Sequence, residues 1–150
     1  MNLPIHTPLI TDTFKTWFDR HGFRHFKADE FTSYFEVERR GVRNSPPPRE
    51  LWMNIVPALR IVDQLREDIR RPVIILSSYR SPGYNKAIDG AATQSHHMKF
   101  QALDIAVSGH MPQEVHRRLS LMRGAGDFKG GLGLYNTFVH IDTRGHNASW

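Results

Sequence analysis

The stretch from Arg49 to Arg70 constrains the fold more than any other part of the sequence, because its apolar residues recur at steps of three and four. These residues are Leu51, Ile55, Leu59, Val62, Leu65 and Ile69. The spacing predicts one long helix with a single buried face. Pro57 inside this stretch predicts a kink, and Pro72 predicts the end of the helix.

Apolar runs typical of short strands follow this helix. They cover residues 73–77, 102–107, 132–135 and 138–143, and the last two are joined by a turn at Asn136. A helix that begins at Met111-Pro112 and ends near Arg123 lies among them. Helices first, then strands with one helix between them, favour the α+β class over a doubly wound sheet. We expect a small antiparallel sheet with helices packed on one side.

The first 45 residues predict a helical and irregular extension that packs on a single domain spanning 1–150. A short helix capped by Thr11 or Asp12 and ended by Gly22 would present Phe14, Trp17 and Phe18 on one face. A further helical turn is expected around 29–34, and the prolines at 46–48 form a stiff connector. Internal repeats and a convincing domain boundary are absent from the sequence.

Composition excludes several classes of protein. With 39% hydrophobic residues the chain is too apolar for intrinsic disorder, and without cysteine it has neither disulfides nor a thiol nucleophile. The longest apolar run, 73–76, is far shorter than the roughly 20 residues of a membrane span. Residues 1–10 contain no readable secretory signal. The formal net charge of +5 suits an anionic partner such as nucleic acid, a cell-wall polymer or a lipid head group.

Three segments hold potential metal ligands. Side chains alternate between the two faces of a strand. Asp104 therefore points to one face and its apolar neighbours at 103 and 105 point to the other, and His140 is separated in the same way from its neighbours at 139 and 141. If the two strands are neighbours, Asp104 and His140 lie side by side, and a loop ending in His97 can close the group. Two histidines, one carboxylate and an open position are typical of catalytic zinc. By spacing alone, the alternative is an exposed His-x-Asp pair beside a polar loop.

Several motifs occur together in a familiar order. They are Ser77 to Pro82, Tyr84-Asn85, Ser95-x-His97, Ala102-x-Asp104, Gly131-x-Gly133-x-Tyr135 and Phe138 to Asp142. The chain thereby resembles the M15 family of zinc D-Ala-D-Ala carboxypeptidases and peptidoglycan peptidases, loosely over 26–143 and well over 73–142. The resemblance implies a Hedgehog/DD-peptidase-like fold and zinc bound by His97, Asp104 and His140.

The same resemblance implies roles at the substrate. Arg80 would hold a substrate carboxylate or polarise the scissile carbonyl, since a guanidinium grips a carboxylate through two hydrogen bonds. Ser95 would shape the loop or orient a ligand, and Tyr84 would line the substrate pocket. The alternatives are a surface arginine in a Ser-Pro turn for Arg80 and ordinary packing for Tyr84.

Two positions depart from the family pattern. Phe100 stands where the family often has glycine, which predicts a reshaped pocket or lid. Thr137 stands where many members carry the Glu or Asp that acts as general base, and threonine cannot deprotonate water at neutral pH. Asp142 is the nearest replacement as catalytic base, or else a partner that fixes a histidine tautomer. His96 is a weaker candidate for the base.

These observations predict a zinc-dependent metallopeptidase that hydrolyses peptidoglycan stem peptides, of D-Ala-D-Ala carboxypeptidase or endopeptidase type. We expect a monomer that works in cytoplasmic wall-peptide recycling or reaches the wall by phage-type release. The first alternative is a non-catalytic binding or structural module of phage origin, which the threonine at 137 favours. A nucleic-acid-binding domain is favoured by charge alone, so we expect no nucleic-acid partner.

Overall fold

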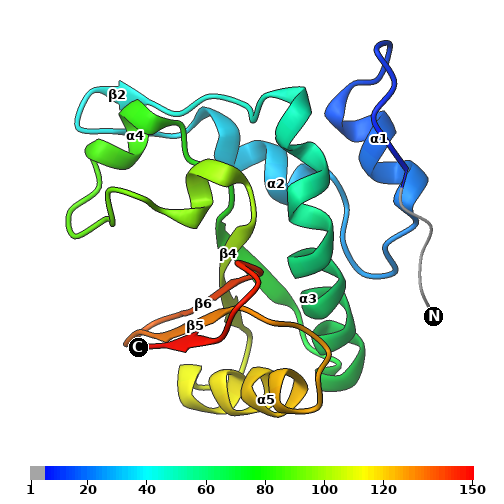
Figure 1. The fold of residues 1–150 in the computed structure, drawn as a ribbon, viewed down its shortest axis with the longest axis vertical. Coiled ribbons are helices and arrows are strands. Elements are labelled where there is room, and N and C mark those ends of the chain that lie inside the picture. The colour runs from blue at the N-terminus through cyan, green and yellow to red at the C-terminus, as the bar shows by residue number, and fades with distance from the viewer. Residues whose placement is uncertain (1–5) are drawn as a thin grey trace.

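The computed structural model describes residues 6–150, which form a mixed α+β fold and confirm the predicted class (Figure 1). The N-terminal part contains α1 (Phe14–His21), α2 (Asp29–Thr32), the 3-10 helix η1 (Ser33–Glu36), β1 (Glu38–Arg39), β2 (Val42–Arg43), the 3-10 helix η2 (Arg49–Ile55) and α3 (Val56–Ile69). The rest contains β3 (Val73–Ser77), α4 (Pro82–Lys86), the 3-10 helix η3 (His96–Lys99), β4 (Ala102–Val107), α5 (Pro112–Gly124), β5 (Gly131–Leu134), β6 (Val139–Asp142) and β7 (Ala148–Ser149). Within residues 6–150, none of these helices has the length and apolar character of a membrane-crossing segment.

The main sheet has five strands in the order β3-β4-β6-β5-β7. Neighbouring strands from β3 to β5 pair antiparallel, as predicted, and β7 pairs parallel to β5 at the far edge. The four predicted strands are all present, and β4 covers the predicted range of 102–107. The sequence did not indicate β7 or the β1–β2 hairpin, because strands of two residues are too short to show alternation.

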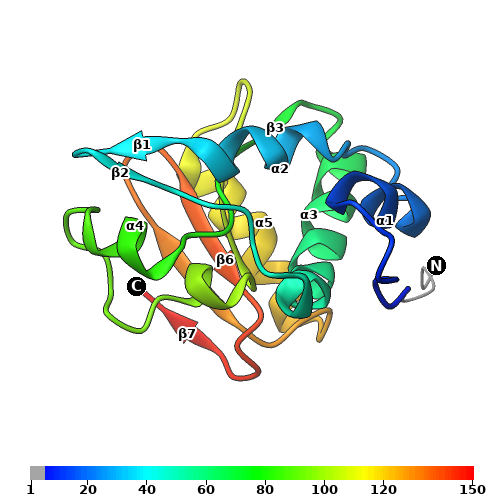
Figure 2. The ribbon, with the colours of Figure 1, turned by 90° about the horizontal axis from the view of Figure 1, so that it is seen from above.

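One face of the sheet forms the hydrophobic core. Leu103 and Ile105 of β4 and Ile141 of β6 are fully buried there, packed with side chains of α3 and α5. In Figure 1 α5 lies below the sheet and α3 runs beside it, and Figure 2 shows α5 behind β6 with α4 on the other side. The opposite face carries Asp104 and His140, so alternation places polar side chains away from the helices.

The long helix predicted from 49 to 70 is divided in two. Residues 49–55 form the 3-10 helix η2, and the α-helix begins only at Val56. Pro57 therefore lies in the first turn of α3, where its missing N–H costs no hydrogen bond, so the predicted kink is wrong. Arg70 ends α3 in a left-handed conformation, with φ of 52°, two residues before Pro72.

The first helix begins at a different cap from the one predicted. Thr13, rather than Thr11 or Asp12, caps α1, and its side chain accepts a hydrogen bond from the backbone N–H of Thr16. Asp12 instead accepts a hydrogen bond from Nη2 of Arg20 at 2.7 Å, which is why it is unavailable as a cap. Gly22 ends the helix as predicted, with a left-handed φ of 63°.

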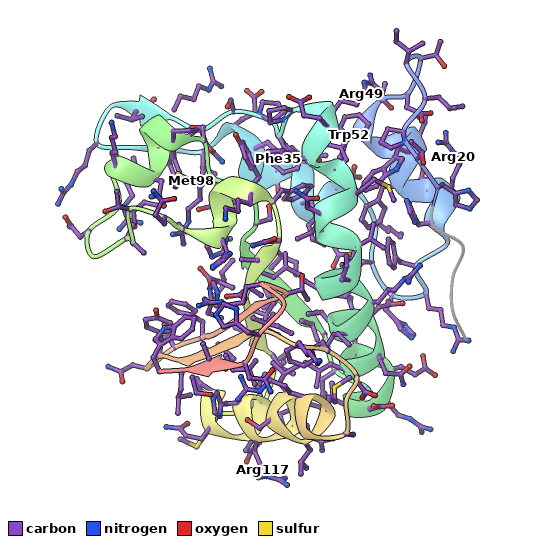
Figure 3. All side chains as sticks on the ribbon, viewed as in Figure 1. Arg20, Phe35, Arg49, Trp52, Met98 and Arg117 are labelled. Carbon is purple, nitrogen blue, oxygen red and sulfur yellow. The ribbon has the colours of Figure 1, made fainter. Side chains whose placement is uncertain are left out.

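An aromatic layer joins the N-terminal segment to the rest of the core. Trp17 and Trp52 pack with ring centroids 5.5 Å apart, and Phe14 bridges to Phe35 at 5.2 Å. Figure 3 shows Phe35 and Trp52 in this layer, between α2, η2 and α1. Arg49 covers the outer face of Trp52, with its guanidinium carbon 4.7 Å from the ring centroid. The packing supports the proposal that the N-terminal residues belong to the same domain as the sheet.

His21 is enclosed by this layer. It is 1% exposed, its ring lies 4.7 Å from that of Trp17, and neither ring nitrogen has a hydrogen-bond partner among the described residues. Burial, together with the positive charges of His6, Arg60 and Arg20 nearby, lowers the pKa of His21 to about 4. The folded protein therefore holds this imidazole in its neutral form near neutral pH.

Stability is expected to fall as the pH drops from about 6.5 to about 4. In that window the unfolded chain binds a proton at His21 and the folded chain does not, so acid favours unfolding. The shift corresponds to a loss of roughly 2–3 kcal/mol in the free energy of unfolding at pH 4.5. His21→Phe should remove most of this loss, measured by urea unfolding at pH 7.5 and 4.5. An equal loss in both proteins would contradict the assignment to His21.

Candidate metal centre

Three side chains from separate segments meet on the open face of the sheet. Asp104 of β4 pairs directly with His140 of β6, which meets the condition that the two strands be neighbours, and Nδ1 of His140 lies 3.0 Å from Oδ1 of Asp104. His97 of η3 places Nε2 at 3.2 Å from the same oxygen. One ligand atom from each residue lies within 4.8 Å of the other two, and all three residues are buried. The structure thus brings together the three residues that the family resemblance implies as metal ligands.

The loop before β4 fixes the orientation of His97. Ser95 caps η3, with its Oγ accepting a hydrogen bond from the backbone N–H of His97 at 3.3 Å. Nδ1 of His97 lies 2.7 Å from the carbonyl oxygen of Ser78, which can only accept, so the proton of the ring is on Nδ1. Nε2 is then an unprotonated nitrogen, and it has no hydrogen-bond partner within residues 6–150.

His140 is held from its other side by Asp142. Nε2 of His140 donates to Oδ2 of Asp142 at 2.8 Å, which leaves Nδ1 facing Asp104. Asp142 is fully buried, and its Oδ1 accepts from the backbone N–H of Gly131 at 2.9 Å and from Arg144. Asp142 does not line the pocket described below. This geometry favours the tautomer-fixing role over the catalytic-base role that the sequence also allowed.

Burial and charge act in opposite directions on these groups. Burial lowers the pKa of His97. Burial alone would raise the pKa of Asp104, but the two histidines outweigh it and hold that pKa below the usual range. For His140, the hydrogen bonds to Asp104 and Asp142 outweigh burial and raise the pKa. The cluster therefore keeps the Asp104 carboxylate ionised, which is the form that binds cations.

A pocket of about 340 Å³ opens above the three ligands. Arg80 lines it and is fixed at two points: Nε donates to Oγ of Ser77 at 3.0 Å and Nη2 donates to Oδ2 of Asp104 at 3.0 Å. Ser95 and His96 also line the pocket. Arg80 and Ser95 thus lie where the sequence placed them, beside the ligands rather than on the outer surface.

Tyr84, a predicted substrate-binding residue, and Thr137, at the position of the family's general base, both lie outside the pocket. Tyr84 is 4% exposed, packs edge-to-face against Tyr34 at 6.1 Å and does not line the pocket, because α4 turns its ring toward the N-terminal segment. Thr137 is exposed in the turn between β5 and β6, outside the pocket. Sequence order placed both near the motif, but only the backbone path decides which way a side chain points.

The structure adds two lining residues that sequence reasoning missed. Arg144 follows β6, and Trp150 follows β7, whose two residues gave no strand signal. Tyr135 and Phe138, in the turn between β5 and β6, also line this side of the pocket, with their rings stacked 4.4 Å apart. The sequence feature that could have indicated this side of the pocket was an aromatic residue, Phe138, close in sequence to His140.

Phe100 does not reshape the pocket, contrary to expectation. It ends η3 with a left-handed φ of 53°, a conformation that glycine adopts at low cost, which explains why glycine suits this position. Its ring is fully buried in the core, 6.1 Å from the rings of Phe14, Phe35 and Tyr79. At this position the phenylalanine therefore adopts a strained backbone conformation, and its buried ring adds to the packing of the core.

Replacing Phe100 by glycine is expected to destabilise the protein by about 1–4 kcal/mol. Loss of a buried phenylalanine ring costs roughly 3–5 kcal/mol, and relief of the left-handed backbone returns about 1–2 kcal/mol. Urea unfolding at pH 7.5 measures the difference. A glycine variant as stable as the parent would show that the backbone strain dominates.

The donor set fits a zinc ion. Two imidazole nitrogens and one carboxylate oxygen are the usual protein ligands of a catalytic zinc site, and the unpartnered Nε2 of His97 is the buried polar atom that such an ion would satisfy. The second ring nitrogens are held by the Ser78 carbonyl and by Asp142, as ligating histidines require. Such a donor group at the base of a pocket is suited to metal-assisted hydrolysis.

Comparison with known proteins identifies the family of this chain. Residues 24–142 match the family described as Peptidase M15, so the chain belongs to that family. Among individual proteins, the peptidoglycan L,D-endopeptidase MepK of Escherichia coli strain K12 is 36% identical over 80 residues, and MepK of Shigella flexneri matches equally. The match covers 49% of this chain and 41% of the relative, so the chain spans less than half the length of the curated relatives it matches. No solved structure gave a significant match.

Proposed function

We propose that this chain is a zinc-dependent endopeptidase that hydrolyses peptide bonds in peptidoglycan stem peptides. The observation that carries the proposal is the group of His97, Asp104 and His140 at the base of an open pocket. Membership of the peptidase family supports hydrolysis of a peptide bond as the reaction.

The ligand residues have distinct tasks in this proposal. His97 would bind zinc through Nε2, His140 through Nδ1 and Asp104 through a carboxylate oxygen. When bound, zinc supplies a Lewis acid that polarises a carbonyl oxygen and lowers the pKa of a water molecule. Asp142 keeps the Nε2 proton on His140, so that Nδ1 remains available as a ligand.

Arg80 positions the substrate. Its guanidinium is held by Ser77 and Asp104, and it lines the pocket beside the ligands. From there it donates hydrogen bonds to the carbonyl oxygen of the scissile bond as negative charge develops on it. A donor that is already oriented needs no reorganisation during the reaction, which is the usual source of such stabilisation.

The substrate class rests on the relatives and on charge. The E. coli relative carries the name peptidoglycan L,D-endopeptidase, and its match includes about half of this chain. The formal net charge of +5 favours association with an anionic wall polymer. We therefore propose endopeptidase activity on cross-linked stem peptides rather than removal of a terminal residue.

The test begins with metal content and continues with defined muropeptides. Elemental mass spectrometry of untagged protein is expected to give about one zinc per chain. Mass spectrometry of the digests should show cross-linked dimers converted to monomers, whereas a carboxypeptidase would release single terminal amino acids. Activity should disappear with a chelator and return with zinc. Zinc without cleavage of any muropeptide would contradict the proposal and favour the non-catalytic module.

A further inference from the structure

A second arginine lines the pocket and has no task in the mechanism above. The guanidinium of Arg144 pairs with Asp142, with Nε 2.9 Å from Oδ1 and Nη2 2.7 Å from Oδ2. The ring of Trp150 lies against it, 5.1 Å from the guanidinium carbon. Asp142 takes two of the five N–H donors of this group, and no residue in the described part of the chain accepts from Nη1. One edge of the Arg144 guanidinium is therefore held by Asp142, and the N–H groups of the other edge can donate to a ligand.

The sheet order places this arginine on the opposite side of the ligands from Arg80. Across the sheet, Arg80 follows β3, Asp104 lies in β4, His140 lies in β6 and Trp150 follows β7 at the far edge. The ring of Trp150 lies 5.1 Å from that of His140. Two cationic groups thus flank the ligand group, so a substrate lying across it meets Arg80 on one side and Arg144 on the other.

Strand β5 leaves room for the ring of Trp150 to lie against the sheet beside Arg144. Trp150 exchanges two backbone hydrogen bonds with β5, at Leu132 and Leu134, so its position is fixed. A Cβ at Gly133 would lie 2.5 Å from the indole nitrogen of Trp150, and a Cβ at Gly131 would lie 2.9 Å from Arg144 and 3.0 Å from Trp150. Because both glycines lack a side chain, the ring lies directly over the strand. Trp150 is 48% exposed, which leaves part of its surface open to the pocket.

The chemistry of this wall points to a carboxylate. A guanidinium matches a carboxylate through two parallel hydrogen bonds, and that of Arg144 is only 18% exposed, so little water competes. The carboxylates of this pocket region already have partners: Asp142 is engaged by His140 and Arg144, Asp104 by His140 and Arg80, and Asp89 by Arg40. The positive charge of a bound metal would add to the attraction. Stem peptides of peptidoglycan carry free carboxylates along the chain and at its end.

We propose that Arg144, backed by Trp150, is a specificity-determining residue that binds a free carboxylate of the substrate residue beside the scissile bond. This inference rests on the proposed peptidase function and adds to it a second anchor. Arg80 then donates hydrogen bonds to the carbonyl oxygen of the scissile bond. Arg144 favours stem peptides with a free carboxylate over those in which it is amidated.

The test compares two substrates that differ in one group. A stem peptide with the free carboxylate and the same peptide with a carboxamide are given to the zinc-loaded parent and to Arg144→Gln. The parent should prefer the acid by about 10- to 100-fold in kcat/KM, and the variant should lose most of that preference through slower cleavage of the acid. An Arg144 that only supports Asp142 would slow both peptides equally, and an unchanged ratio would overturn the proposal. Arg117→Gln, on the outer side of α5 in Figure 3, is the matched control and should keep the ratio of the parent.

A binding measurement keeps the two proposals distinguishable. Calorimetry with non-cleavable acid and amide analogues measures the subsite in zinc-loaded protein without turnover, and zinc content is checked in each variant. Acid preference in binding with no cleavage would support the subsite and contradict the peptidase. Equal affinity for both analogues in the parent would overturn the subsite. If Arg144→Gln does not fold, Trp150→Ala should reduce the acid preference because it frees the guanidinium to move.

Discussion

His140→Ala is expected to abolish binding of the proposed zinc ion and to lower the proposed hydrolysis of stem peptides by about three orders of magnitude or more. His140 stands at the centre of the site, with Asp104 on one ring nitrogen and Asp142 on the other. Without it the site keeps one nitrogen and one oxygen ligand, fewer than a catalytic zinc site requires. The proposed activation of water, which depends on the metal lowering the pKa of that water, would then be lost.

The control for this variant is His116→Ala. His116 lies on α5, outside the pocket, and its Nδ1 lies 3.5 Å from the Ser120 hydroxyl, so zinc content and activity should stay at the parental level. Elemental mass spectrometry and muropeptide digestion measure both quantities, and circular dichroism checks the fold of each variant. Full zinc occupancy in His140→Ala, with a native fold, would show that the metal binds elsewhere.

Asp142→Asn is expected to weaken zinc binding by about 10- to 100-fold. Asp142 fixes the orientation of His140 and pairs with Arg144, and an amide of the same size keeps the shape but loses the charge. Loss of such an outer partner of a metal ligand has an effect of this size. Competition with a chelator measures the zinc affinity, and excess zinc should restore much of the activity.

The catalytic-base interpretation of Asp142 predicts a different result. Zinc affinity would then stay near the parental value, and kcat at saturating zinc would fall by about 10² to 10⁴. The complete burial of Asp142, and its absence from the pocket wall, favour the first outcome. Asn is preferable to Ala here because it keeps the side-chain volume and one oxygen acceptor, so that no cavity is left at this buried position.

Alternation in two short strands predicted which faces carry two of the three residues in the site. Leu103 and Ile105 had to face the helices, so Asp104 had to face the other way, and the same holds for His140 on β6. The one condition that the sequence left open was that the two strands be neighbours, and the register confirms it. His97 depended on the path of a polar loop, which the family resemblance supplied and strand alternation did not.

Errors arose where local patterns compete with packing. The apolar stripe from 49 to 69 is continuous, yet the backbone changes from 3-10 to α at Val56, so that Pro57 falls in a first turn. Phe100 looked like a pocket residue because of its distance from His97, but its left-handed backbone turns the ring into the core. Tyr84 was misplaced for the same reason, since position along the chain does not give the direction of a side chain.

The sequence by itself determined the α+β class, the central strands and the faces of Asp104 and His140, because periodicity is a local property of the chain. Only the tertiary structure decided that Asp142 lies behind His140 and that Arg144 and Trp150 complete the pocket. These placements depend on β7 pairing with β5 and on two glycines that leave room for the indole. Contacts of this kind join residues distant in sequence, and their geometry is set by the packing of whole elements rather than by any local pattern.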